Sequence, residues 1–200
     1  MKLYESLEIT EKPLIKLREW LDEAILVGTA LPHAMNLATV NLKGRPCSRM
    51  VLMKSLSDKG LVFFTDYTSK KGKQLEHNQY ASCTFWWPTT DKQIRIEGYC
   101  NKISNTDSDT YFESRPRGSK ISATVSMQSE VIETYDSLVK ESIRYEEENR
   151  KKEIRRPERW GGFIFQPERI EFWEKQSNRL HKRELFELIS NDWKESMLSP

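Results

Sequence analysis

The sequence predicts a mainly β protein, an antiparallel β-barrel with helices at its periphery. Two observations support this fold class. Short apolar runs follow one another between turn signals such as Lys43-Gly44, as in a β-meander. Apolar residues recur at helical spacing in only a few segments, which flank or interrupt those runs. Short strands in a meander with peripheral helices are typical of antiparallel barrels.

The first half of the chain begins with a helix and continues into strands. Leu14, Leu17 and Leu21 recur at helical spacing, and Pro13 suits a first helical turn. Ser69 is the expected N-cap of a second helix. The predicted elements are helix 13–27, strands 35–41, 46–54 and 61–65, helix 69–77, and strands 81–87 and 93–103.

The second half starts with helices and returns to strands. Pro116-Arg117-Gly118 separates two of the helices, and the charged stretch 145–156 is expected to be a solvated helix end and loop. Gly161-Gly162 is no nucleotide-binding fingerprint, because it does not join a strand to a helix. The predicted elements are helix 107–114, a helix from 119, helix 135–150, and strands 162–166, 169–174, 180–188 and 192–197.

Length and composition predict a single domain over residues 1–200, with an N-terminal segment and helix at 1–30 and a helical excursion at 105–150. A net charge of +2 gives no general nucleic-acid footprint. Three cysteines without a CxxC pair favour reduced thiols over disulfides or a metal site. No apolar run approaches the ~20 residues of a membrane span, and no signal core opens the chain. We expect a cytoplasmic protein without nucleic-acid or membrane partners.

The most informative segment lies near the C-terminus, where Arg179, His181 and Arg183 alternate. In a strand, residues two apart share a face, so two cations and an imidazole would line one surface. That pattern suits the binding of an anionic ligand. The alternative is a solvated edge strand with ordinary surface charges.

Two further segments place cations where they could bind anions. In the strand that ends Arg49-Met-Val-Leu-Met-Lys54, cations stand at both ends of an apolar run, although an edge strand with charged ends is an alternative. Lys70 and Lys71 follow the predicted N-cap Ser69. Two lysines in a first helical turn are unfavourable with respect to the helix dipole, unless an anion sits there.

A fourth segment combines hydroxyl groups with an arginine. Tyr111, Arg115 and Ser119 flank the predicted helix break and could converge on one phosphate. Alone, this signal is weak. Further along, Gln128-Ser129 is a polar pair with no helical reason for its position.

Taken in order, these segments resemble the pyridoxine/pyridoxamine 5′-phosphate oxidases, from about Met35 to the C-terminus. One of the motifs would be weak evidence, but all of them in order are specific. They are Arg49-Met-Val-Leu-Met-Lys54, Val62-Phe-Phe-Thr65, Ser69-Lys-Lys71, Gln93, Tyr111-Phe-Glu-Ser-Arg-Pro116, Ser126-Met-Gln-Ser129, Trp160-Gly-Gly-Phe163, Ile170-Glu-Phe-Trp173 and Arg179-Leu-His181.

The resemblance implies an FMN-binding split barrel that works as a homodimer, with FMN at the subunit interface. It implies oxidation of pyridoxamine or pyridoxine 5′-phosphate by O2 to pyridoxal 5′-phosphate, with release of H2O2. Hydride would pass from C4′ of the substrate to N5 of the flavin, because the cofactor supplies the redox chemistry. In this scheme Arg179 steadies the pyridine ring, and His181 positions the substrate instead of acting as an obligatory base.

The resemblance also assigns site residues. Arg49 and Lys71 would hold the FMN phosphate with Lys70 nearby, and Gln128, Ser129, Trp173 and Arg183 would reach FMN from the partner subunit. The full set of implied FMN-binding residues is Arg49, Met50, Val51, Leu52, Met53, Lys54, Phe64, Thr65, Lys70, Lys71, Gln93, Gln128, Ser129, Trp173 and Arg183. The implied substrate-binding residues are Lys54, Tyr111, Arg115, Ser119, Arg179, Leu180 and His181, of which Arg179 and His181 are the catalytic pair.

The chain departs from the family's usual pattern at Leu31, Thr124, Met127 and Lys182. In addition, residues 1–11 give no clear match to the arm with which the family closes over substrate. We expect these departures to affect substrate closure more than FMN binding. Two alternatives stay open: a related FMN split-barrel oxidase of another ring, such as a phenazine intermediate, and a non-catalytic flavin- or pyridoxal-phosphate-binding protein.

Overall fold

The computed structural model describes residues 9–200, so the segment compared with the family's closing arm lies largely outside the described residues. No helix in this part of the chain has the length and apolarity needed to cross a membrane. The elements are α1 (Lys12–Leu26), β1 (Ala34–Val40), β2 (Pro46–Leu52), β3 (Ser55–Ser57), β4 (Gly60–Asp66), α2 (Lys70–His77), β5 (Tyr80–Trp87), β6 (Lys92–Lys102), α3 (Asn105–Glu113), α4 (Arg117–Val125), α5 (Tyr135–Glu148), β7 (Trp160–Glu174), the 3-10 turn η1 (Ser177–Arg179), β8 (Lys182–Ile189) and β9 (Asp192–Met197).

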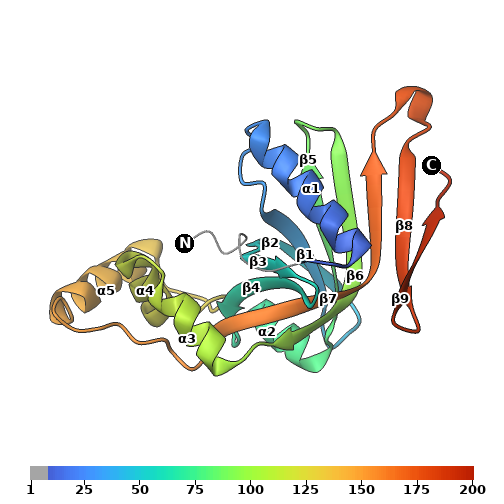
Figure 1. Ribbon diagram of the computed structural model, residues 1–200. Helices are drawn as coiled ribbons and strands as arrows, with labels where there is room; N and C mark the ends of the chain where they lie inside the picture. Colours follow the sequence, from blue (N-terminus) through green and yellow to red (C-terminus); the bar gives the residue numbers. More distant parts are fainter. Residues whose placement is uncertain (1–8) are drawn as a thin grey trace.

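The strands form one antiparallel sheet that divides along β7, which confirms the predicted fold class. The sheet order is β2-β1-β5-β6-β7-β4-β3, with β8 added to β7 and β9 to β8. β7 pairs with β6 along most of its length. On its other edge, the first part of β7 pairs with β4 and the last part pairs with β8. As a result, β8 and β9 lie at one side of the molecule and α3–α5 at the opposite side (Figure 1).

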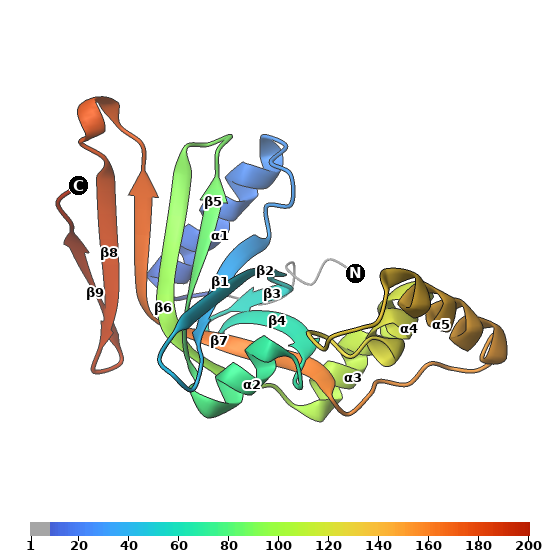
Figure 2. The same ribbon diagram turned by 180° about the vertical axis from the view of Figure 1, so that it is seen from behind.

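Helix α1 covers the core of the sheet. Its leucines at the predicted helical spacing, Leu14, Leu17 and Leu21, are all buried. Trp20 meets Phe172 of β7 edge to face, with ring centroids 5.1 Å apart. Helix α2 lies on the other side of the molecule, below β4 in the view from behind (Figure 2). It begins at Lys70 with Ser69 as N-cap and ends at His77, as predicted.

A second, smaller core attaches the helical excursion to the sheet. Phe112 of α3, Ile121 of α4 and Ile154 pack with Trp160 at the start of β7. Helix α3 begins two residues earlier than predicted, because Ser104 caps it by accepting a hydrogen bond from the backbone N–H of Asp107. This small core fixes the position of α3 and α4 beside β4.

The two strands predicted over 162–166 and 169–174 are one continuous strand, β7. Pro167 lies between them, and proline cannot donate to a ladder. A register shift between Glu97 and Gly98 on β6 absorbs it. A Cβ on Gly98 would lie 2.0 Å from the carbonyl oxygen of Gln166, so only glycine permits this close approach.

The strand predicted over 180–188 was wrong at its start. Asn178 and Arg179 have positive φ angles of 54° and 61°, so the chain turns there and β8 begins only at Lys182. Left-handed backbone is compatible with a turn and not with a strand. The predicted alternation along one strand therefore does not occur. Arg179 lies in the turn, His181 comes just before β8, and Arg183 belongs to β8.

Candidate functional site

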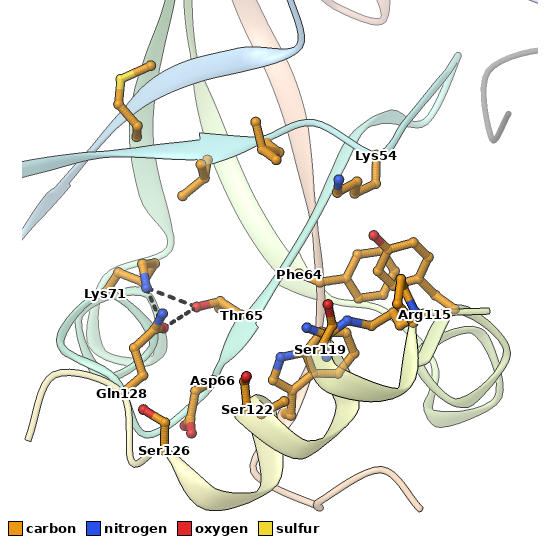
Figure 3. A pocket seen from close by; sticks show the side chains of 17 residues that line it. Lys54, Phe64, Thr65, Asp66, Lys71, Arg115, Ser119, Ser122, Ser126 and Gln128 are labelled. Carbon is orange, nitrogen blue, oxygen red and sulfur yellow. Dashed lines mark hydrogen bonds between the residues drawn. The ribbon is translucent and has the colours of Figure 1, made fainter. Parts of the chain in front are cut away.

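A cavity of about 610 Å³ lies between the β2–β4 part of the sheet and the α3–α4 excursion. Cations stand at both of its ends, with Lys71 on one side and Lys54 and Arg115 on the other (Figure 3). Its lining consists of Met50, Val51, Leu52, Lys54, Phe64, Thr65, Asp66, Lys71, Tyr111, Arg115, Pro116, Ser119, Ser122, Ala123, Ser126, Gln128 and Trp160. Eleven of the predicted site residues, which come from segments far apart in the sequence, therefore line one cavity.

Lys71 marks the first end of the cavity. Its side chain comes from the first turn of α2 and is 8% exposed. The ammonium donates to Thr65 Oγ1 at 2.9 Å and to Gln128 Oε1 at 2.7 Å. Burial, together with the charge of Arg49, lowers the pKa of Lys71 to about 8, and Asp66 offsets this only in part. The hydrogen-bond partners of the ammonium are neutral and Asp66 compensates its charge only in part, so an anion bound here would be favoured.

Arg49 is held beside this end by a buried network. Its guanidinium donates to Thr39 Oγ1 at 2.6 Å, to the Leu37 carbonyl at 3.2 Å and to Gln74 Oε1 at 3.2 Å. Thr39 and Gln74 are themselves buried and hydrogen-bonded to each other. Burial lowers the pKa of Arg49 from its usual range. The network fixes the guanidinium in place without neutralising it.

Arg115 and Lys54 form the second cationic end. The Arg115 guanidinium lies 4.5 Å from the ring of Trp160 and 5.4 Å from that of Phe112. Its Nη1 is buried and has no hydrogen-bond partner among residues 9–200. Burial lowers the pKa of Arg115, and burial with the charge of Arg115 lowers that of Lys54. A buried donor without a hydrogen-bond partner destabilises the protein, so an anionic acceptor bound to Arg115 Nη1 would be stabilising.

Aromatic rings connect the two ends. Phe64 of β4 stacks on Tyr111 of α3, with centroids 3.8 Å apart, and on Trp160 at 5.4 Å. Burial raises the pKa of Tyr111, so its hydroxyl stays protonated and can donate a hydrogen bond. An aromatic and apolar wall between two cationic ends suits flat ligands that carry anionic groups.

Several predicted site residues lie elsewhere, in a row across β6, β7 and β8. Gln93 pairs with Trp173, and Trp173 pairs with Arg183 in the strand register. Arg183 donates to the buried Glu171 at 2.7 Å and to the Ser199 carbonyl at 2.8 Å. None of these three residues lines the cavity of the same chain.

The turn after β7 holds the next part of this second group. His181 packs against Trp173, with ring centroids 4.5 Å apart. Its Nδ1 accepts a hydrogen bond from the backbone N–H of Gln176 at 3.1 Å. Arg179 and Leu180 stand in the turn, and Leu180 is 70% exposed. The row and the turn together form a second surface, composed of Gln93, Trp173, Arg179, Leu180, His181 and Arg183, which we call the β7–β8 surface.

Four predicted FMN-contacting residues occupy positions that differ from expectation. Met53 is fully buried in the core, while Lys70 and Ser129 are exposed and do not line the cavity. Gln128 was expected to act from the partner subunit. Instead it lies in the cavity of its own chain, where its Oε1 accepts from both Thr65 and Lys71. Its role toward the FMN of the partner subunit stays a prediction.

Sequence reasoning missed other residues of the site. Thr39 and Gln74 show no motif, and their role depends on the packing of α2 against β1, which no local pattern specifies. Trp160 was noted only within the motif Trp160-Gly-Gly-Phe163, although it supports Arg115. Among residues 9–200, no cluster of three or more His, Cys, Asp or Glu side chains could hold a metal ion.

Comparison with known families identifies two matching regions. Residues 21–149 match the sequence model described as pyridoxamine 5′-phosphate oxidase. Residues 160–200 match the model described as the pyridoxine 5′-phosphate oxidase C-terminal dimerisation region. The second match covers most of the β7–β8 surface, whereas the first covers nearly all of the cavity.

Individual relatives agree over almost the whole chain. A pyridoxine/pyridoxamine 5′-phosphate oxidase of Nostoc punctiforme is 43% identical over 98% of this chain and 92% of its own. One of Haemophilus influenzae is 43% identical over 95% and 90%. Among solved structures, PhzG from Burkholderia lata, in complex with tetrahydrophenazine-1-carboxylic acid, has a TM-score of 0.91 at 29% identity and covers 99% of this chain and 100% of its own. By full-length identity and by both family matches, the chain belongs to the pyridoxine/pyridoxamine 5′-phosphate oxidase family.

Proposed function

We propose that the protein is an FMN-dependent oxidase that converts pyridoxamine or pyridoxine 5′-phosphate to pyridoxal 5′-phosphate with O2. The observation that supports this most strongly is the pair of partly buried cationic ends in one cavity, Lys71 with Arg49 and Lys54 with Arg115. A phosphorylated cofactor and a phosphorylated substrate need two such ends. The 43% identity to two relatives named pyridoxine/pyridoxamine 5′-phosphate oxidase supports the same activity.

The residues at the first end fit the phosphate of FMN. Lys71 and Arg49 supply fixed positive charge there, with Lys70 nearby, and Gln128 closes the same end from the segment after α4. Met50, Val51 and Leu52, together with Phe64 and Thr65, would line the flavin ring. When bound, FMN supplies the acceptor for two electrons and passes them to O2. The protein's part is to bind, to orient and to exclude water.

The second end fits the phosphate of the substrate. The unpaired Nη1 of Arg115 and the ammonium of Lys54 supply the charge, and the hydroxyls of Tyr111 and Ser119 stand beside them in the cavity lining. The stacked rings of Tyr111, Phe64 and Trp160 hold this end rigid. An unphosphorylated substrate would leave Arg115 without its acceptor.

A second copy of the chain would complete the site. The residues of the β7–β8 surface do not line the cavity of the same chain. Strand β8 and the helices α3 and α4, which bound the cavity, lie at opposite sides of the molecule (Figure 1). A homodimer in which this surface covers the partner's cavity brings Trp173 and Arg183 to the flavin, and Arg179 and His181 to the substrate ring. The match of residues 160–200 to a dimerisation region supports this arrangement.

His181 fits a positioning role better than that of a general base. Because Nδ1 accepts the Gln176 N–H, the neutral ring carries its proton on Nε2. Nε2 is then a donor toward ligand and has no free lone pair with which to remove a proton. Packing against Trp173 restrains the ring in that orientation.

A second candidate is oxidation of a phenazine-type ring, because the PhzG structure is similar over the full length. The cluster of Lys54, Tyr111, Arg115 and Ser119 favours a phosphorylated substrate instead. A non-catalytic binding protein is the third candidate. The cytoplasmic location expected from the sequence stays a prediction.

The visible spectrum of the purified protein tests the function directly. We expect flavin bands that bleach when pyridoxamine 5′-phosphate is added without air and return when air is admitted. Bleaching by tetrahydrophenazine-1-carboxylic acid alone would favour the phenazine-type oxidase. Flavin bands that neither compound bleaches would indicate a non-catalytic flavoprotein.

Replacing Lys71 tests the first cationic end. Lys71→Met should raise the Kd of the apo-protein for FMN by roughly 30- to 1,000-fold, or about 2–4 kcal/mol, because it removes a buried charge opposite the phosphate. Wild-type affinity should fall as pH rises above about 8, since neutral Lys71 must then take up a proton to bind the anion. The slope is at most about tenfold per pH unit for one proton.

FMN fluorescence quenching at pH 7 to 10 measures both effects. Lys73→Met, an exposed lysine on the same helix, is the matched control and should keep the wild-type Kd and pH dependence. An unchanged pH dependence in Lys71→Met would show that another group binds the phosphate.

Replacing His181 and Arg179 separates positioning from proton transfer. His181→Asn can still accept the Gln176 N–H, so we expect a loss in turnover on the order of tenfold, whereas loss of an essential base would cost ~10²–10⁴-fold. Arg179→Ala should reduce turnover and substrate binding together. FMN content should stay normal in both. Steady-state oxidation of pyridoxine 5′-phosphate, with flavin occupancy read from the spectrum, decides. Abolished turnover in His181→Asn at full occupancy would contradict the positioning role.

A further inference from the structure

Arg159, the residue just before β7, braces the C-terminal end of α4. Its Nη2 donates to the carbonyl oxygens of Ala123 at 3.0 Å, Thr124 at 2.8 Å and Ser126 at 3.2 Å. The last carbonyls of a helix have no partner within the helix, and a cation placed there also complements the helix dipole. One guanidinium therefore satisfies the end of α4 and fixes where the chain leaves it.

The same guanidinium faces Asp66 at the end of β4. Arg159 Nε lies 3.0 Å from Asp66 Oδ2, in an ion pair whose carboxylate side chain is 4% exposed. The other carboxylate oxygen, Oδ1, accepts from the N–H and the hydroxyl of Thr68. A backbone hydrogen bond joins the same two segments, because the Tyr67 N–H donates to the Arg159 carbonyl at 2.6 Å. Arg159 is thus fastened to the loop that leads into α2.

These contacts join the two segments that meet at Lys71. The Asp66 loop runs through Ser69 into Lys71, and the chain that leaves α4 reaches Gln128 two residues after Ser126. Gln128 then accepts from Lys71 and Thr65 (Figure 3). Ser119, at the second end of the cavity, stands on α4 as well. Arg159 itself is not part of the cavity lining, so it acts through the residues that are.

We propose that Arg159 is a positioning residue that clamps the end of α4 to the Asp66 loop and thereby holds Gln128 against Lys71. The inference rests on the proposed function for its link to FMN, but the clamp itself is a property of the chain. The forked shape of the guanidinium is the essential feature: its Nε edge faces the Asp66 carboxylate in an ion pair that is not aligned as a hydrogen bond, while Nη2 donates to the helix end. A lysine keeps the charge but has a single ammonium group, which cannot serve both sides at once.

The test compares Arg159→Lys, Arg159→Gln and a matched control. Arg156→Gln is the control, because Arg156 is also a largely buried arginine that pairs with an aspartate, Asp109, and a backbone carbonyl, but it braces α3 instead. Amide hydrogen exchange over residues 117–130 reports the clamp, and the Kd of the apo-protein for FMN reports its effect at Lys71. Arg159→Lys decides the question if Arg159→Gln fails to fold.

We expect both Arg159 variants to exchange faster over residues 122–128 and to bind FMN about tenfold more weakly, as for loss of charge-assisted hydrogen bonds at a site. Arg156→Gln should keep the wild-type exchange over residues 122–128 and the wild-type Kd for FMN. Wild-type exchange over 122–128 in Arg159→Lys, or wild-type FMN affinity despite faster exchange, would overturn the proposal. Failure of the wild-type protein to bind FMN would instead count against the proposed function, and hydrogen exchange would still decide the clamp.

Discussion

Burial of positive charge without a carboxylate ion pair is the constraint on which the rest of the structure depends. Among residues 9–200, Lys71, Arg49, Lys54 and Arg115 form no ion pair with an acidic side chain, although burial lowers the pKa of each. Removing a cation from water is costly unless an opposite charge compensates it. Neutral hydrogen-bond partners offset part of that cost. Thr65 and Gln128, for example, hold the ammonium of Lys71 in place and leave its charge available to an anion.

The architecture explains how such a site is built and why one chain does not finish it. β7 connects both parts: its first residues face the cavity through Trp160, and its last residues carry Trp173 into the β7–β8 surface. On the edge of β7 that does not pair with β6, β4 pairs with the first residues and β8 with the last. The cavity and the β7–β8 surface therefore lie at opposite ends of β7. A second copy is the simplest way for both surfaces to reach one ligand.

Local patterns in the sequence predicted most of the elements, and the resemblance to the family implied the residues that gather in the cavity. The N-cap Ser69 and the helix that begins at Lys70 are examples, since capping is a short-range signal. The extension of the turn through His181 was missed, because left-handed backbone at Arg179 is not typical of arginine. The continuity of β7 through Pro167 was missed, because it depends on Gly98, which lies opposite it in β6 and 69 positions earlier in the chain. The Thr39–Gln74 network and the Arg159 clamp join segments far apart in sequence, and no motif marks them.

Subunit complementation tests most directly whether two chains build each site. Arg115→Ala disables the cavity and Arg179→Ala disables the β7–β8 surface, and each homodimer should have little activity. After the two variants are unfolded together and refolded, random pairing makes half of the dimers mixed, and each mixed dimer has one intact site, so about a quarter of the wild-type activity should return. Mixing Arg115→Ala with Lys71→Ala, both in the cavity, should restore nothing. Activity no greater than the sum of the two homodimers in the first mixture would contradict a site shared between subunits.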